Sequence, residues 1–297
     1  MLALLCVVWG LNFSVAKGAL EVMNPMHFQV FRFGFALPPL AAILLIDWRR
    51  RRSSNPPAED APLKGPPARG MFARLWVRGA VIGLLLWMGF SLQIIGLKYT
   101  TASRSGFFTG LVVVAAPLLA FVLRTSRTPR FSWFGVVPAV AGVYLLAGPN
   151  SGGMNIGDWL TILCAIVFGG QMVALEALAG PVGDTWRLTF IQVAVVFLGT
   201  VIWCLVEGAT ICSSPAVWLA VGYTAVFGTV ATVWLQTRFQ PEVPAGHAAL
   251  VYTLEPVFAA GFAWLLLGDR WTTLGLFGAA LILAAMVVSS YAITRST

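Results

Sequence analysis

Apolar residues form long runs that recur along the whole chain, and short polar connections separate these runs. A helix needs about 17 to 25 predominantly apolar residues to cross a bilayer, and counting runs of that length predicts about ten membrane-spanning helices. The expected segments are residues 2–20, 27–47, 78–97, 102–123, 130–148, 157–176, 186–207, 215–236, 245–267 and 272–292. The pattern therefore predicts an all-α membrane protein.

One connection is much longer than the others and covers residues 48–77. It begins WRRRRSSNPPAEDAPLKGPPARG, which is rich in proline and charge and poor in apolar residues. Such a composition cannot form a packed core, so we expect a disordered cytoplasmic loop. The run Arg49–Arg52 can contact anionic lipid, but arginines beside a span more commonly set the topology, and we favour that interpretation.

Two stretches repeat the same order of features, residues 92–147 and residues 235–288. Each starts with Leu-Gln, turns a polar corner, passes through small residues and carries a proline inside the next span, Pro117 or Pro256. A half with an odd number of spans, about five, must place its second copy in the opposite orientation, as secondary transporters do. We therefore expect two inverted halves, residues 1–148 and 154–293, with a site at their interface.

Composition agrees with a membrane protein, because 59% of the residues are hydrophobic and 10% are charged, whereas soluble domains carry about 25% charged residues. The net charge of +8 does not indicate a nucleic-acid partner, since the basic residues lie between apolar segments. Most of them fall on one side of the membrane if both termini are cytoplasmic, and the positive-inside rule predicts that topology. We expect an inner (plasma) membrane of the bacterial type.

The first apolar run follows Met1 directly, without the basic residues that open a signal peptide, so we interpret it as a spanning helix. The two histidines and four cysteines show no metal-ligand spacing. No phosphate-binding loop is present either, so we expect no metal, no cofactor and no direct use of ATP.

Several motifs together resemble the EamA-type permeases of the drug/metabolite transporter superfamily. They are WGLNF at 9–13, RFGFA at 32–36, GLKYTTASRSGFFTGLVVVAAPLLA at 96–120, YTLEPVFAAGFAWLLLGDRWT at 252–272 and GAALILAA at 278–285. The resemblance covers nearly the whole chain, which departs from it in the long loop 48–77. It implies two five-helix halves around a central cavity that moves small metabolites, often amino acids or amphipathic solutes, outward.

Glu255 lies in the middle of segment 245–267, directly before Pro256. A carboxylate at that depth costs about 2.5–3.5 kcal/mol, so it should face the protein interior or a watery cavity. In one interpretation Glu255 exchanges a proton as the cavity changes sides. In the other it hydrogen-bonds the backbone that Pro256 disturbs and fixes a kink. Both interpretations stay open at this point.

Polar and aromatic side chains within the spans supply the other candidates for the cavity wall. Pockets combine apolar walls with a few polar groups, although each of these side chains can instead bond or pack against a neighbouring helix. The candidates are Trp9, Asn12, Trp87, Ser91, Gln93, Thr109, Gln171, Tyr223 and Tyr252.

Two basic residues within the first spans are expected to extend toward the outer interface. Arg32 and Lys17 are long enough to place their charges in the head-group region, and Lys17 lies four residues from Glu21, with which it can pair. Glycines four residues apart, Gly79 with Gly83 and Gly106 with Gly110, predict helix faces that pack closely.

The sequence therefore predicts a secondary transporter rather than an enzyme, working by alternating access. Its expected partners are a small-molecule substrate and the lipid bilayer. An exporter of amino acids or amphipathic solutes is what the resemblance favours. The alternatives are a membrane-embedded enzyme acting on lipids, for which no cluster of catalytic side chains is evident, and a non-transporting membrane assembly subunit.

Overall fold

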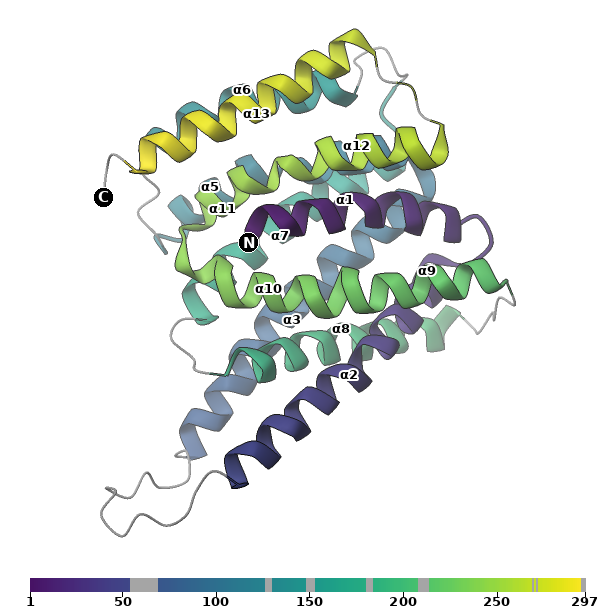
Figure 1. The fold of residues 1–297 in the computed structure, drawn as a ribbon, viewed down its shortest axis with the longest axis vertical. Coiled ribbons are helices and arrows are strands. Elements are labelled where there is room, and N and C mark those ends of the chain that lie inside the picture. The colour runs from purple at the N-terminus through teal and green to yellow at the C-terminus, as the bar shows by residue number, and fades with distance from the viewer. Residues whose placement is uncertain are drawn as a thin grey trace.

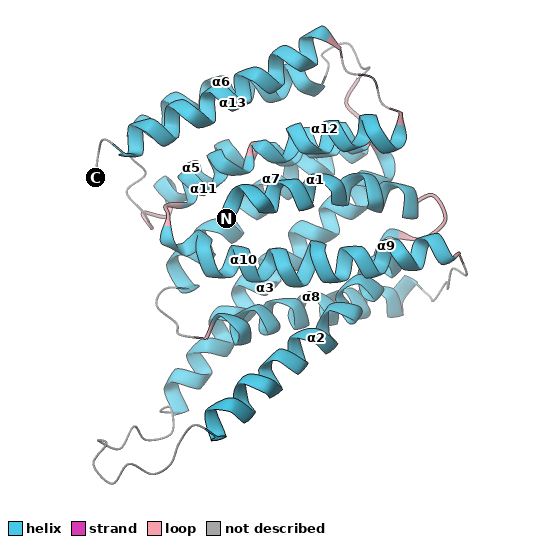
Figure 2. Cartoon of the chain, in the orientation of Figure 1, coloured by secondary structure: helices cyan, strands magenta, loops and turns pink. Residues whose placement is uncertain are grey.

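A computed structural model describes residues 1–53, 69–125, 130–147, 153–179, 184–207, 214–268, 270 and 272–294. In this part of the chain all regular structure is helical (Figure 2). Seven of the ten expected segments are continuous helices: α1 (Leu2–Ala19), α2 (Pro25–Ser53), α3 (Arg69–Tyr99), α6 (Arg130–Ala147), α7 (Ile156–Ala179), α8 (Thr185–Glu207) and α13 (Thr273–Thr294). The predicted all-α fold is confirmed.

The other three segments are interrupted inside the span. One is α4 (Ala102–Gly110) followed by α5 (Val112–Val122), and one is α11 (Ala245–Tyr252) followed by α12 (Leu254–Leu267). The third is α9 (Pro215–Ala225), the π-helix η1 (Val226–Ala231), α10 (Thr232–Phe239) and the short 3₁₀-helix η2 (Gln240–Glu242).

The break between α11 and α12 follows from Pro256. Its ring would collide with the carbonyl of Tyr252, four residues earlier, and it has no N–H to donate. The helix therefore stops at Thr253, whose backbone N–H donates to the Leu250 carbonyl at 3.2 Å. The Thr253 hydroxyl donates to the same carbonyl at 2.6 Å. Pro256 then lies in the first turn of α12, where a missing N–H costs little.

The expectation of a loop over all of residues 48–77 is wrong at both ends. Helix α2 continues to Ser53 and α3 already begins at Arg69, and Figure 1 shows the two helices extending past the rest of the bundle. Arginine is a good helix former, so polar residues beyond the apolar run prolong the helix. Residues 54–68, where disorder was also expected, lie outside the described residues.

Much of the molecule's surface is apolar. Leu205, Val206 and Leu219 are 78%, 86% and 77% exposed, an arrangement that suits lipid and would promote aggregation in water. In the described residues eight helical segments are long and apolar enough to cross a bilayer, and two shorter apolar helices accompany them. The chain is a multi-pass membrane protein.

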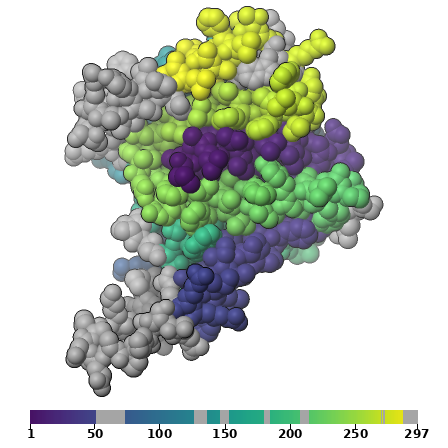
Figure 3. All heavy atoms as spheres, viewed as in Figure 1, coloured from purple at the N-terminus to yellow at the C-terminus, as the bar shows by residue number. Residues whose placement is uncertain are grey.

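The most extensive contacts between helices join a helix from residues 1–148 to one from residues 154–293. Examples are the pairs α3 with α7, α6 with α13 and α1 with α12. Figures 1 and 3 show α1, in purple, lying between the α11–α12 span and the α9–α10 run. Glycines allow this proximity, because the backbone of one helix fills the space that a side chain would occupy. Gly10 faces Phe258 and Ala259, while Gly142 faces Gly278.

The two glycine pairs lie on helix faces that pack closely against neighbouring helices, as expected. Gly79 and Gly83 of α3 pack against Ile191 and Val195 of α8. Gly106 packs against Ala259, and Gly110 lies against the ring of Pro256, at 3.2 Å from where its own Cβ would stand. The broken spans α4–α5 and α11–α12 are therefore in direct contact at the centre of the bundle.

We predict that Gly157→Ala destabilises the protein. A Cβ at Gly157 would overlap the backbone of Gly96 and Tyr99 where α7 crosses α3, and overpacking costs about 1–3 kcal/mol. The matched control is Gly222→Ala in α9, where a Cβ meets nothing within 4 Å and alanine improves helix propensity. Thermal unfolding in detergent should show a lower midpoint for the first variant alone, and equal midpoints would contradict the packing argument.

Candidate functional site

A small cavity lies at the centre of the bundle, beside the breaks in the spans α4–α5 and α11–α12. Its volume is about 50 Å³, enough for a few water molecules and less than the roughly 300–1,000 Å³ of pockets that hold a ligand. Eight helices contribute to its wall, which consists of Trp9, Leu86, Phe90, Gln93, Thr109, Val112, Phe168, Gln171, Met172, Gln236, Tyr252 and Glu255.

Two hydrogen bonds join polar side chains of the cavity wall, and each involves a glutamine amide. Gln236 Nε2 donates to Gln171 Oε1 at 3.3 Å, and Gln93 Nε2 donates to Thr109 Oγ1 at 3.3 Å. The amide nitrogen of Gln171, Nε2, is buried and has no hydrogen-bond partner among the described residues. The same holds for the indole nitrogen Nε1 of Trp9. Buried polar atoms without partners are rare in proteins, so these two donors suit hydrogen bonds to a solute.

Glu255 borders the same cavity from the first turn of α12 and is 7% exposed. In the described part of the chain its carboxylate makes no ion pair, and no hydrogen bond to it is found. The hydroxyl of Thr253, rather than the carboxylate, bonds the backbone at the break. Glu255 therefore borders the cavity, while another residue bonds the backbone at the break. Pro256 packs against Gly110 beside it.

The structure brings five of the nine polar and aromatic candidates to the cavity wall: Trp9, Gln93, Thr109, Gln171 and Tyr252. The ring of Trp9 meets that of Tyr252 edge-on, with centroids 5.2 Å apart. Glu255, Gln236 and Phe90 complete the wall together with the apolar residues Leu86, Val112, Phe168 and Met172. Sequence reasoning did not single out these four, because an apolar residue that faces a cavity resembles one that faces lipid.

Four candidates lie away from the cavity, which corrects the expected wall. Trp87 packs on Gly199 and borders an apolar groove between α3 and α8. Ser91 follows it by one turn, so it shares that face of α3 rather than the face of Gln93. Asn12 packs against Gly228 of the π-helix. Tyr223 contacts Phe227, with ring centroids 5.6 Å apart.

Arg32 is buried and does not extend to the outer interface, so that expectation is wrong. Its Nε donates to Thr229 Oγ1 and its Nη2 to the Gly228 carbonyl, both at 2.9 Å. The guanidinium carbon lies 4.9 Å from the ring centroid of Phe90, which is part of the cavity wall. Because a π-helix shifts the regular hydrogen bonds and leaves a carbonyl accessible, an arginine inside the bundle finds acceptors there.

Lys17 also differs from expectation, since no ion pair with Glu21 forms in the described residues. Its ammonium donates instead to the carbonyls of Leu97, Lys98 and Thr100 at 2.9, 3.2 and 2.7 Å. These carbonyls end α3 and have no partner within that helix. The positive charge also suits the negative end of the helix dipole.

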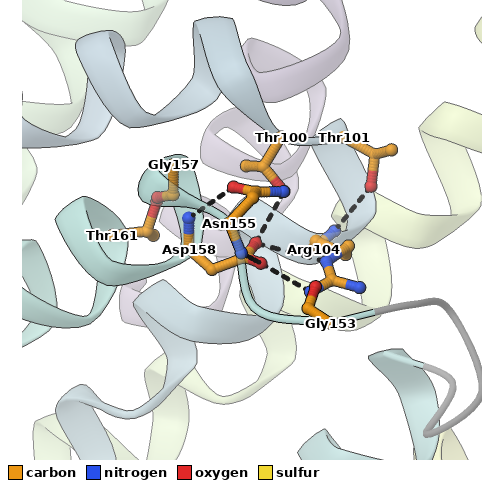
Figure 4. A network of polar contacts seen from close by, with 8 residues as sticks. All are labelled: Thr100, Thr101, Arg104, Gly153, Asn155, Gly157, Asp158 and Thr161. Atoms are coloured by element: carbon orange, nitrogen blue, oxygen red, sulfur yellow. Dashed lines mark hydrogen bonds and ion pairs between the residues drawn. The ribbon is translucent and has the colours of Figure 1, made fainter.

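A polar network that the sequence did not reveal joins α3, α4 and α7 (Figure 4). Arg104 of α4 donates from Nε and Nη2 to the two carboxylate oxygens of Asp158 at 3.2 and 2.5 Å, and the Thr100 hydroxyl donates to Asp158 Oδ1 at 2.7 Å. Asn155 and Asp158 cap the start of α7 by reciprocal bonds of 2.9 and 3.0 Å. The spacing Asn-x-x-Asp before an apolar run is the signal that could have identified this site.

No group of three or more potential metal ligands occurs among the described residues. The cavity wall instead combines one carboxylate, three amides, two hydroxyl groups and aromatic rings in a small volume. That mixture is typical of sites that bind small solutes.

The comparisons with known proteins agree with this picture. The sequence profile of the EamA-like transporter family matches residues 1–148 and again residues 155–291. A protein described as an uncharacterized transporter of Archaeoglobus fulgidus is 30% identical over 97% of this chain and 84% of its own length. The protein described as uncharacterized inner membrane transporter YedA, of Escherichia coli K12, is 27% identical over 95% and 88%.

Among solved structures, one crystal structure superposes with a TM-score of 0.71 at 16% identity, covering 99% of this chain and 96% of that one. A likeness at so low an identity shows a shared fold and nothing more.

We predict that Arg32→Lys destabilises the protein more than Arg32→Met does. Lysine keeps the buried charge but loses the planar fork that reaches Thr229 and Gly228 together, and one lost hydrogen bond to a charged group costs about 1.5–3 kcal/mol. Methionine removes the charge and its desolvation cost as well. Thermal midpoints in detergent measure the order, and a lysine variant that equals the wild type would contradict it.

Proposed function

Because the chain belongs to the EamA-like transporter family, we propose that it is a secondary transporter that exports small metabolites, such as amino acids or amphipathic solutes, across an inner membrane. The observation that carries the proposal is the cavity, with polar groups in its wall, at the point where two broken spans meet in a membrane-spanning bundle. Transporters place their substrate sites at interrupted helices near mid-membrane.

The proposed mechanism is alternating access between two inverted halves, residues 1–148 and 154–293. The extensive contacts of α1 with α12 and of α3 with α7 support this mechanism, because both link a helix of one proposed half to a helix of the other. Relative movement of the halves would then reshape the cavity wall, to which both contribute. The excess of arginine and lysine in alternate connections supports cytoplasmic termini.

The cavity wall supports a substrate that is small and polar on at least one side. Trp9 Nε1 and Gln171 Nε2 offer hydrogen-bond donors, which match a carbonyl, carboxylate or hydroxyl oxygen. Trp9, Phe90, Phe168 and Tyr252 add aromatic surface for an apolar part. The cavity must expand for such a solute to bind, since its volume of about 50 Å³ holds only a few water molecules.

We propose that Glu255 couples transport to protons. A carboxylate in the membrane interior without a cationic partner is stable there when it holds its proton, and it can lose that proton once its side of the cavity opens to water. Glu255 meets this description, because it is buried at the cavity and is unpaired in the described part of the chain.

Flux measurements in proteoliposomes test the transporter proposal. Vesicles containing the protein would be loaded with labelled amino acids, nucleosides and amphipathic drugs, and we expect at least one class to leave. Gln171→Met, which keeps the shape of the side chain, should reduce that flux about tenfold, because losing a buried hydrogen-bonding group costs about 1–3 kcal/mol. Leu205→Ala on the lipid-facing surface, where the residue is 78% exposed, serves as the control and should transport normally. Conversion of a lipid without any flux would refute the proposal.

The proton-coupling proposal predicts the behaviour of Glu255→Gln. An inward proton gradient should accelerate export by the wild type, whereas the variant should transport at a rate that does not respond to pH, since glutamine cannot exchange a proton. Glu242→Gln, at an exposed carboxylate that pairs with Arg238, is the matched control and should keep the pH response. If Glu255→Gln retained the wild-type response, Glu255 would not be the coupling group.

A further inference from the structure

The two broken spans in contact at the cavity are held by the same helix, α7, at its opposite ends. Span α4–α5 begins beside Asp158 in the first turn of α7, and span α11–α12 begins beside Glu176 near its last turn. The two spans therefore start at opposite ends of α7 and run in opposite directions. Each carboxylate therefore faces the start of one broken span.

At the first end the contact is an ion pair between helices. Arg104 of α4 bonds both oxygens of Asp158, whose side chain is fully buried while that of Arg104 is 12% exposed. Thr100 adds a third bond from the end of α3. A buried pair with this geometry is poorly screened by salt, and removing one partner leaves the other charge uncompensated. We call Arg104, Asp158 and Thr100 the first latch.

At the second end the contact is between a carboxylate and a helix N-terminus. The backbone N–H of Ala245, the first residue of α11, donates to Glu176 Oε2 at 2.7 Å. The first N–H groups of a helix have no partner within it, and the positive end of the helix dipole favours a carboxylate there. The side chain of Gln240 donates to the Met172 carbonyl at 3.0 Å and holds the preceding turn. Glu176 with Ala245 forms the second latch.

Both contacts are formed in this structure, and the cavity wall includes residues of α7 and of both broken spans. We infer that Asp158 and Glu176 are positioning residues that close the two ends of the transport path. In this proposal a solute leaves on a given side when the broken span on that side separates from α7, and each half-cycle releases one latch while the other holds.

This inference rests on the proposed transport function and extends it by naming the groups that open and close each side. Latch strength sets how populated each open state is, because removing a contact found only in the closed state shifts the equilibrium toward opening. If the two carboxylates served stability alone, removing either one would change access to the cavity equally from both sides. If each closes one end of the path, removing it increases access from that end only.

Labelling of a single cysteine in the cavity tests the assignment. In a chain with its native cysteines replaced, Val112→Cys places a thiol in the cavity wall. A membrane-impermeant thiol reagent is then applied to right-side-out or inside-out vesicles. We expect slow labelling from both sides for the parent chain. Asp158→Ala should raise the labelling rate severalfold from the side of the first latch alone, and Glu176→Ala should do so from the other side alone.

Matched controls remove an acidic side chain at each end without touching a latch. The first control is Glu21→Ala, at a residue in the connection between α1 and α2, on the same side of the bundle as the first latch. Asp184→Ala breaks a pair with Arg187 three residues away, at the end of the second latch. Neither should change labelling. Asp158→Asn keeps one acceptor oxygen, so it should give a smaller, equally one-sided rise if the alanine variant does not fold.

Equal acceleration from both sides by either variant, or no acceleration by any of the folded variants, would overturn the inference. The measurement requires no substrate. One-sided labelling in a protein that moves none of the tested solutes would therefore refute the proposed transport function and leave the latches standing, whereas flux without one-sided labelling would do the reverse.

Discussion

A bilayer offers no hydrogen bonds to the backbone, so every interruption of a helix within it must be satisfied by the protein itself. This constraint explains where the three broken spans lie. Thr253 bonds the Leu250 carbonyl at the break before α12. At the π-helix, Thr232 and Arg32 both donate to the Gly228 carbonyl. The breaks occur inside the bundle, where side chains of neighbouring helices are within reach, and the cavity forms beside two of them.

Charged groups inside the bundle follow the same rule by different means. Asp158 has an arginine and capping bonds, and Arg32 has a carbonyl, a hydroxyl and two aromatic rings. Glu255 has neither a cation nor a hydrogen bond in the described residues, and it alone of the three borders the cavity. A buried acid without compensation is costly unless it changes protonation or meets a partner. Glu255 therefore differs from Asp158 and Arg32, whose charges are satisfied by neighbouring groups.

Packing between helices then connects these sites mechanically. Glycines bring α7 against α3 and α1 against α12, so the backbones touch with little side-chain material between them. Closely packed helices move as units rather than deforming continuously. Because α7 contacts the start of both broken spans, this one helix links the two ends of the cavity.

The sequence by itself determined the class of the protein, the ten apolar segments and a disturbance of the backbone at Pro256, because apolar run length and proline chemistry act locally. It also identified Glu255, since an ionisable residue within an apolar run is visible without a structure. Only the tertiary structure decided which side chains share the cavity: Gln93 faces it and Trp87 does not, although both lie in one helix. It alone placed Arg32 at the π-helix and joined Arg104 to Asp158. Such pairings depend on how each helix is rotated against its neighbours, and the rotation is set by contacts between residues far apart in the chain.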